Sequence, residues 1–229
     1  MLVPALALAG AALRLRGRRL AALAAALALV LAAFATRLEP LAVHTFLWAH
    51  LLQNVVLAEW APALLVLAVP PALAARVRIP PLVALPLWVA TYFVWHLPPL
   101  YDLALQHAGS LLRLEHLTYL VAGCLLWWPV VHGRLPSGAK AAYLFAAFVL
   151  ASPLGLLLAL LPRAVYDTYV DAAPSWGLSA LADQQIAGVT MAGEQAVVFF
   201  AAFSVFFRRF LSEESRAGTF DELARQRLR

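Results

Sequence analysis

Three histidines, His50, His96 and His116, occur inside apolar stretches of the sequence, each about one helical turn from the predicted end of its stretch. Ionisable side chains at such a depth are costly in lipid and usually face the interior of a helical bundle or a cavity. Imidazole nitrogen is a good ligand for copper, zinc and iron. Three imidazoles from three segments at one depth therefore predict a metal site, for which Asp183 is a further candidate ligand.

A histidine that binds a metal needs a partner for its second ring nitrogen, usually a carboxylate or an amide. The candidate partners, which are also alternative ligands, are Glu115, Gln53, Asn54 and Gln184. His50 and Asn54 are four residues apart and share one face of a helix, next to Gln53.

Sulfur ligands are almost absent from the chain, which has one cysteine, Cys124, and two methionines. A thiolate or thioether relay for copper is therefore excluded. A site made of histidine and oxygen ligands favours Cu(II) or zinc over Cu(I).

Two further acidic residues, Glu59 and Glu194, lie deeper in their apolar stretches, about 14 Å from the histidine level at 1.5 Å per helical residue. Carboxyl groups near the middle of a membrane are expected to be protonated or paired. One interpretation is a route for protons or metal ions through the membrane. The other is a hydrogen bond that joins two helices.

The segments that carry these residues are apolar enough to cross a membrane. Hydrophobic residues make up 64% of the 229 residues and charged residues only 13%, with a mean hydropathy of +0.82. A soluble domain carries about a quarter charged residues. The fold class is therefore all-α, a polytopic transmembrane bundle of six spans with the lipid bilayer as its solvent. The apolar runs cover residues 20–36, 45–69, 82–97, 114–131, 141–161 and 185–207.

Three segments follow from this pattern: an apolar and basic N-terminal segment at 1–19, the bundle at 20–208, and a polar tail at 209–229. Residues 1–13 are too short to span a membrane, which takes about 20 residues, so they form an interfacial helix or a clipped first span. The run at 82–97 is the weakest span because it is short and rich in proline. Pro62, Pro86 and Pro153 should kink their helices without ending them.

Basic residues are distributed unevenly over the predicted loops. Fourteen of the 17 fall on one side of the six-span topology, which makes that side cytoplasmic, together with both chain termini. Five of the six histidines then lie on the outer side, and only His132 is cytoplasmic. His44 and His107 are expected to be interfacial anchors in loops.

Several functions are excluded by what the sequence lacks. The only lysine, Lys140, lies in a predicted cytoplasmic loop, so a retinal Schiff base inside the bundle is excluded. The sequence has no HExxH, GxSxG or phosphate-loop motif. The net charge of +5 comes from loop residues that determine topology, so no nucleic-acid partner is expected. No nucleophile or acid–base pair is evident, and the chain is predicted not to be an enzyme.

Four short blocks of this sequence resemble the CtaG family of cytochrome c oxidase assembly factors, the multi-spanning kind associated with caa-type oxidases. The resemblance covers about residues 40–210, with the blocks in the order of the family. They are His50-Leu-Leu-Gln53-Asn54 running on to Ala61-Pro62, Trp95-His96-Leu97-Pro98 with Tyr101-Asp102, Leu114-Glu115-His116-Leu117 leading to Trp127-Trp128-Pro129, and Asp183-Gln184-Gln185 with Gly188.

The resemblance implies a bacterial plasma-membrane protein that is needed to make active oxidase, with oxidase subunits as partners and copper as the metal. It also implies seven spans, which would fit a clipped first span at residues 1–13. The polar residues of the family correspond to His50, His96, His116, Asp183 and Gln184. This chain departs from the common pattern at Asn54, where many members have a second histidine, and so lacks an i, i+4 histidine pair.

We therefore expect a copper-binding oxidase assembly factor, with zinc as another candidate metal. The alternatives are a haem-binding redox protein with axial histidines, a proton or ion conduit that uses Glu59 and Glu194, and a metal-free scaffold for oxidase subunits. The oligomeric state does not follow from the sequence.

Overall fold

The computed structural model of the chain describes residues 15–170, 172 and 177–227, and the predicted segment at 1–13 lies outside them. The described residues contain helices and no strands. The helices are α2 (Arg18–Phe34), α3 (Leu38–His44), α4 (Leu47–Val55), the π-helix η1 (Val56–Trp60), α5 (Ala61–Ala68), α6 (Pro71–Ala74), α7 (Pro81–Trp95), α8 (Pro98–Gln106), α9 (Leu111–Val131), α10 (Ser137–Leu160), α11 (Asp167–Val170) and α12 (Ala180–Arg227).

Each of the six predicted apolar runs forms a helix, which confirms the all-α polytopic bundle. Four helical segments are each long and apolar enough to cross a membrane, and they are Leu47–Ala68, Leu111–Val131, Ser137–Leu160 and Ala180–Ala217. Two bent pairs qualify only when their helices are taken together: α2 with α3, which meet at 53°, and α7 with α8, which meet at 75°. The described residues therefore hold four to six spans. The run at 82–97, predicted as the weakest span, belongs to the more sharply bent pair, α7 with α8.

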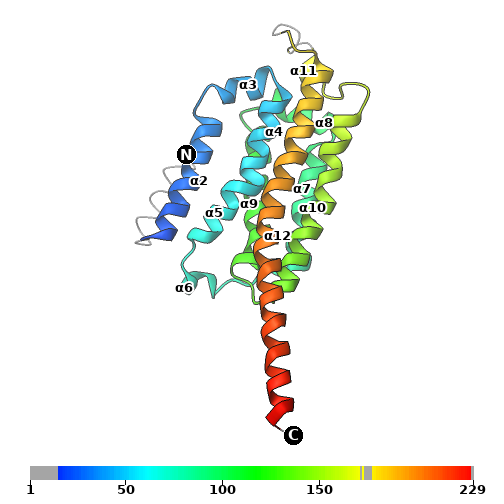
Figure 1. Ribbon diagram of the computed structural model, residues 1–229. Coiled ribbons are helices and arrows are strands. Elements are labelled where there is room, and N and C mark those ends of the chain that lie inside the picture. The colour runs from blue at the N-terminus through cyan, green and yellow to red at the C-terminus, as the bar shows by residue number, and fades with distance from the viewer. Residues whose placement is uncertain (1–14, 171, 173–176, 228–229) are drawn as a thin grey trace.

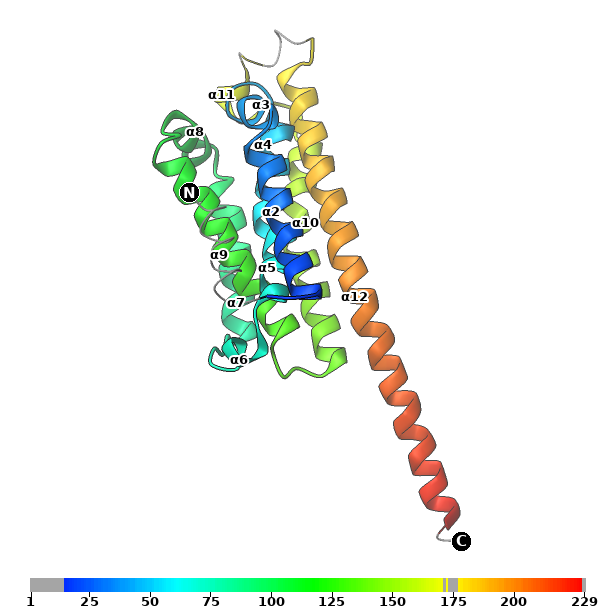
Figure 2. The ribbon, with the colours of Figure 1, turned by 90° about the vertical axis from the view of Figure 1, so that its left-hand side faces the viewer.

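The long helices lie side by side, and the short helices cap the two ends of the bundle (Figure 1). Helices α3, α8 and α11 lie at one end, which we call the α8 end, and α6 lies at the opposite end, which we call the α6 end. Helix α12 continues well beyond the α6 end (Figure 2). The predicted tail at 209–229 is therefore continuous with the last span through Arg227. Residues 208–227 contain no proline and are rich in Arg, Glu, Leu and Ala, which favour helix.

Prolines interrupt these helices less than their number suggests. Pro86 and Pro153 lie inside α7 and α10, so both helices continue through proline as predicted. Near Pro62 the chain stays helical but widens into η1 just before the proline. A single π turn inside a longer helix is a common feature of functional sites, and η1 carries Glu59.

Small residues allow α10 and α12 to pack closely. A Cβ added to Gly188 would lie 2.5 Å from both the Gly155 carbonyl oxygen and the Ala159 nitrogen. Any larger side chain at Gly188 must therefore push the two helices apart. Small residues of this kind let two helix backbones approach closely.

Candidate functional site

The predicted site residues meet inside the α8 end of the bundle. His50 comes from α4, Glu115 and His116 from the first turns of α9, and His96 from the residue that ends α7. His50 is 1% exposed, His96 5% and Glu115 0%. The bend between α7 and α8 thus places His96 at the same end of the bundle as histidines from two other helices.

His50, His116 and Glu115 are direct neighbours. The Nε2 atom of His50 lies 3.6 Å from Oε1 of Glu115, and the ring centres of His50 and His116 are 5.9 Å apart. Asn54 donates a hydrogen bond of 2.9 Å to the same Oε1 atom. The carboxylate of Glu115 is therefore held between a side-chain amide and the imidazole of His50.

Tyr101 connects this group to His96. Its ring centre lies 5.0 Å from that of His50 and 5.8 Å from that of His96. The His96 ring also stacks on Tyr92 at 6.1 Å. The rings of His50 and His96 thus both pack against one buried tyrosine, Tyr101.

The hydrogen bonds of His50 determine which of its ring nitrogens carries a proton. Its Nδ1 atom lies 3.0 Å from the Tyr169 hydroxyl. That hydroxyl donates its own hydrogen to the Ala42 carbonyl oxygen at 2.6 Å. The Tyr169 oxygen must then accept from His50, so Nδ1 carries a proton, and in the neutral imidazole the lone pair is on Nε2.

His96 has the same tautomer for a similar reason. Its Nδ1 atom lies 2.8 Å from the Tyr92 carbonyl oxygen, which can only accept a hydrogen bond. Nδ1 of His96 therefore carries a hydrogen, and the Tyr119 hydroxyl oxygen 3.2 Å away is a second acceptor for it. The lone pair of His96 is again on Nε2.

Six buried polar atoms of this cluster have no hydrogen-bond partner. They are Nε2 of His50, His96 and His116, Oε2 of Glu115, Oδ1 of Asn54 and the hydroxyl of Tyr101. A buried polar atom without a partner costs about 1–3 kcal/mol, and such atoms are uncommon in folded proteins. A metal ion would satisfy lone pairs of this kind. No three or more His, Cys, Asp or Glu side chains within the described residues are, however, already placed around one ion.

Asp183 lies at the same end of the bundle but has a different environment. Its two carboxylate oxygens accept the backbone N–H groups of Leu47 at 2.7 Å and Trp48 at 3.2 Å. Both N–H groups belong to the first turn of α4. N–H groups there lack partners within the helix, and negative charge nearby is favoured. Asp183 thus joins α12 to the start of the helix that carries His50. Its predicted role as a ligand stays a prediction.

The predicted amide partners hold neighbouring segments in place. Gln53 donates to the Ala33 carbonyl oxygen at 2.8 Å and to Glu39 at 2.6 Å, which ties α4 to α2 and α3. Gln184 accepts the backbone N–H of Val165 at 2.8 Å and donates to the Arg163 carbonyl oxygen at 3.1 Å. Gln184 therefore positions the connection that leads to Tyr166.

Tyrosines form much of the wall of the site, although none of them was predicted as a site residue. Tyr92, Tyr101, Tyr119 and Tyr169 are fully or almost fully buried next to the histidines. Burial raises the pKa of Tyr169 well above its ordinary value, so its hydroxyl stays protonated. The sequence does contain a signal for these tyrosines. Tyr92 and His96, and likewise Glu115 and Tyr119, are four residues apart and so lie on the same face of a helix.

Asp102 positions the tyrosine that holds His50. Its carboxylate accepts hydrogen bonds from the backbone N–H and the hydroxyl of Thr168, at 3.0 and 2.7 Å, and from the Asp167 N–H at 3.2 Å. These contacts cap the short helix α11, which carries Tyr169. The orientation of the His50 ring therefore depends on a carboxylate from α8.

The deeper carboxyl groups form a separate polar cluster below Tyr92. Glu59 accepts hydrogen bonds from the Tyr92 hydroxyl at 2.6 Å and from Gln195 at 2.9 Å. Glu194 accepts one from the Trp60 indole. One oxygen of each carboxyl group, Oε2 of Glu59 and Oε1 of Glu194, accepts from no N–H or hydroxyl group, and the two carboxyl groups lie within hydrogen-bonding reach of each other. The cluster joins α12 to η1 and α7.

The fold and this site define the class: a polytopic helical membrane protein with a buried cluster of histidine, carboxylate and tyrosine side chains at one end. The chain belongs to the family of cytochrome c oxidase caa3 assembly factors (Caa3_CtaG), which it matches over residues 2–213. This confirms the family expected from the four blocks. The search of curated proteins found no match. The search of solved structures found none either.

Proposed function

We propose that this chain assists assembly of a caa3-type cytochrome c oxidase by binding a copper ion at the α8 end and passing it to an oxidase subunit. Copper is cargo in this proposal, and the chain catalyses no reaction. The observation that carries it is the group of unpartnered atoms: three imidazole Nε2 atoms and one carboxylate oxygen, all buried in one cluster.

The tautomers support this role. A metal ligand must offer a lone pair, and the second ring nitrogen must be held by another group. Both conditions are met at His50, through Tyr169, and at His96, through the Tyr92 carbonyl. His116 lies beside His50 and contributes the third Nε2 atom. Glu115 supplies the negative charge that a divalent cation needs in a buried site.

The ligands of this proposal are His50, His96 and His116, with Glu115 as a fourth. The four side chains do not yet surround a single point, so a bound ion would draw their rings inward. Such a site suits a carrier that must release its ion. Imidazole and carboxylate ligands favour Cu(II), and zinc has the same ligand preference.

Metal analysis of the purified, untagged protein tests the proposal. Wild type is expected to bind copper, and His50→Ala to bind much less. His107→Ala is the matched control, because His107 lies at the same end of the bundle but is exposed. Equal copper in wild type and His50→Ala would exclude His50 from the site. A Soret band in the visible spectrum would instead support the haem alternative.

A second candidate function, a proton or ion conduit, is favoured by the position of Tyr92. Its hydroxyl donates to Glu59, and its backbone carbonyl accepts from His96. One residue thus contacts both the deep carboxyl cluster and the histidine site. We propose that Glu59 and Glu194 exchange protons as the ion binds and leaves.

In the cell, we propose that the protein lies in the bacterial plasma membrane with its α8 end outside. The uneven distribution of basic residues supports this orientation, because 14 of 17 fall at or near the α6 side of the six-span topology.

A further inference from the structure

A pocket of about 620 Å³ lies at the α6 end, far along the bundle from the histidine site. Two connections form it, the one between α6 and α7 and the one between α9 and α10. Its polar residues are Arg78, Arg134 and His132, and none of its lining residues is acidic. The two arginines belong to loops whose positive charge also favours a cytoplasmic position for this end.

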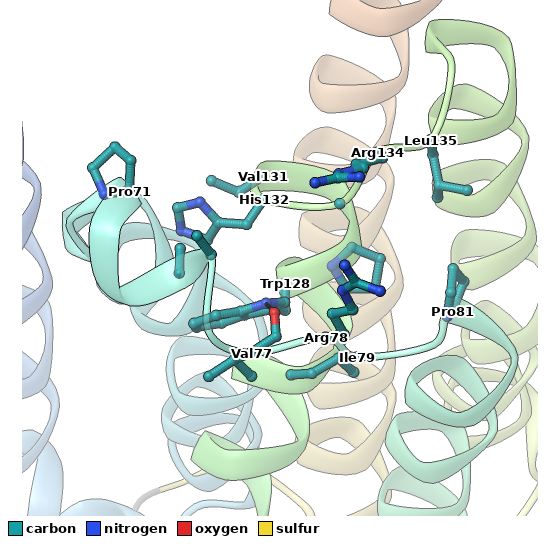
Figure 3. Close-up of a pocket in the computed structure, with 14 residues that line it drawn as sticks. Pro71, Val77, Arg78, Ile79, Pro81, Trp128, Val131, His132, Arg134 and Leu135 are labelled. Carbon is teal, nitrogen blue, oxygen red and sulfur yellow. Dashed lines mark hydrogen bonds between the residues drawn. The ribbon is translucent and has the colours of Figure 1, made fainter.

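The two faces of the pocket differ in chemistry. Figure 3 shows the rings of Trp128 and His132 toward one side and the side chains of Arg78 and Arg134 toward the other. Trp128 is held in place by a hydrogen bond of 3.3 Å from its indole to the Val77 carbonyl oxygen. The ring of His132 packs against it at 5.0 Å.

Charge in the pocket favours an anion. His132 donates from Nε2 to the Val66 carbonyl oxygen at 2.8 Å, which ties the end of α9 to α5. The carboxyl end of α9, at the edge of the pocket, contributes a partial charge of about −0.5. Two guanidinium groups outweigh it by more than one full positive charge. Guanidinium groups are well suited to bind phosphate oxygens in pairs.

The surroundings of the pocket are apolar and open to lipid. Pro81 lines it, and the next residues along α7, Leu82 and Val83, are 88% and 51% exposed. Val77 lines the pocket and is 46% exposed. These residues begin the α7–α8 pair, which together is long and apolar enough to cross a membrane. In a bilayer they would lie where headgroups give way to acyl chains. A basic pocket next to exposed aliphatic side chains at this level matches a lipid headgroup site.

We propose that the pocket binds an anionic phospholipid, with its phosphate between Arg78 and Arg134 and its acyl chains along the start of α7. Trp128 is an aromatic residue of the kind that anchors helices at the interface. The lipid would hold together the two connections that form the pocket.

Native mass spectrometry of the delipidated full chain in detergent tests this proposal, with dioleoyl phosphatidylglycerol as the probe. Phosphatidylcholine is the zwitterionic comparison, and inorganic phosphate is the comparison for a free anion. Phosphatidylglycerol should bind more tightly than phosphatidylcholine, and millimolar phosphate should not displace it. Each arginine-to-glutamine change should weaken phosphatidylglycerol binding about fivefold, and the double variant R78Q/R134Q about 25-fold.

The variant R37Q/R113Q is the matched control, since it removes two exposed arginines from the opposite end of the bundle. It should bind the lipid like wild type, and R78K/R134K should keep most of the affinity. Equal binding of the two lipids, displacement by phosphate, or an equal loss in the control would each overturn the proposal. If the double variant does not fold, the single variants R78Q and R134Q decide it.

Discussion

The Nδ1 atom of His50 lies 3.0 Å from the hydroxyl of Tyr169, and this contact turns the other ring nitrogen toward Glu115. The two residues are 119 positions apart in the sequence. Tyr169 in turn depends on Asp102, which caps its helix. The proposed metal site is therefore supported by a chain of contacts from α8 through α11 to α4.

The first prediction concerns that support. Tyr169→Phe removes the acceptor that holds Nδ1–H of His50, so His50 can rotate or change tautomer. Copper affinity should fall about 10- to 100-fold, as is usual when a partner of a metal-binding histidine is lost. Isothermal titration of the purified protein measures it. Tyr166→Phe is the control, because its hydroxyl donates to the His96 backbone carbonyl and touches no imidazole nitrogen.

A second prediction separates charge from hydrogen bonding at Glu115. Glu115→Gln keeps an oxygen that can accept from Asn54 but loses the negative charge beside His50. Metal affinity should fall while the melting temperature changes little. The control is Glu39→Gln, which alters a partner of Gln53 outside the histidine cluster. Unchanged copper binding in Glu115→Gln would remove this carboxylate from the ligand set.

The third prediction tests the helix cap. Asp183→Ala leaves two N–H groups at the start of α4 without their acceptor. Loss of an N-terminal cap costs about 0.5–2 kcal/mol, so the melting temperature in detergent should fall. Asp183→Asn should cost less, because one amide oxygen can still accept. If Asp183 acts as a ligand instead, Asp183→Asn will lose copper while keeping its stability.

Neutralising the deep carboxyl groups tests the conduit. The variant E59Q/E194Q keeps oxygens that can accept from Tyr92, Gln195 and Trp60. Copper binding should persist. Proton flux into liposomes, measured while the protein binds copper, should be lost. If the proton flux equals that of wild type, the conduit is wrong, and Glu59 and Glu194 serve only to join α12 to η1. Circular dichroism verifies that the variant keeps its helices.

A dependence of stability on alkaline pH follows from the buried tyrosines outside the spans. Burial raises the pKa of Tyr166 and Tyr169 above their ordinary value, which is about 10 in an unfolded chain. The folded state then keeps protons that the unfolded state releases, so stability is constant below about pH 10 and falls above it. Melting curves from pH 8 to 11 measure this. The variant Y166F/Y169F should show a flatter curve.

Local patterns were enough to predict the helices and to place the polar side chains along them. Within the residues that the structure describes, each of the six apolar runs is helical, because in lipid a span must satisfy its backbone hydrogen bonds internally. Local patterns were not enough for the bend after His96 or the π turn at Glu59. Both depend on how proline-containing segments pack against other helices.

The roles of the polar residues depended more on distant contacts. Asp183 is a predicted ligand by its type and depth, and only the structure shows that its oxygens also cap a helix that begins 136 residues earlier. Tyr169 had no predicted role in the site, and only the fold places its hydroxyl next to His50. The sequence by itself determined which side chains lie at which membrane level, because that follows from residue type and spacing along each helix. Only the tertiary structure decided which of them meet and which atoms remain without a partner, since these depend on how helices rotate and pack against one another.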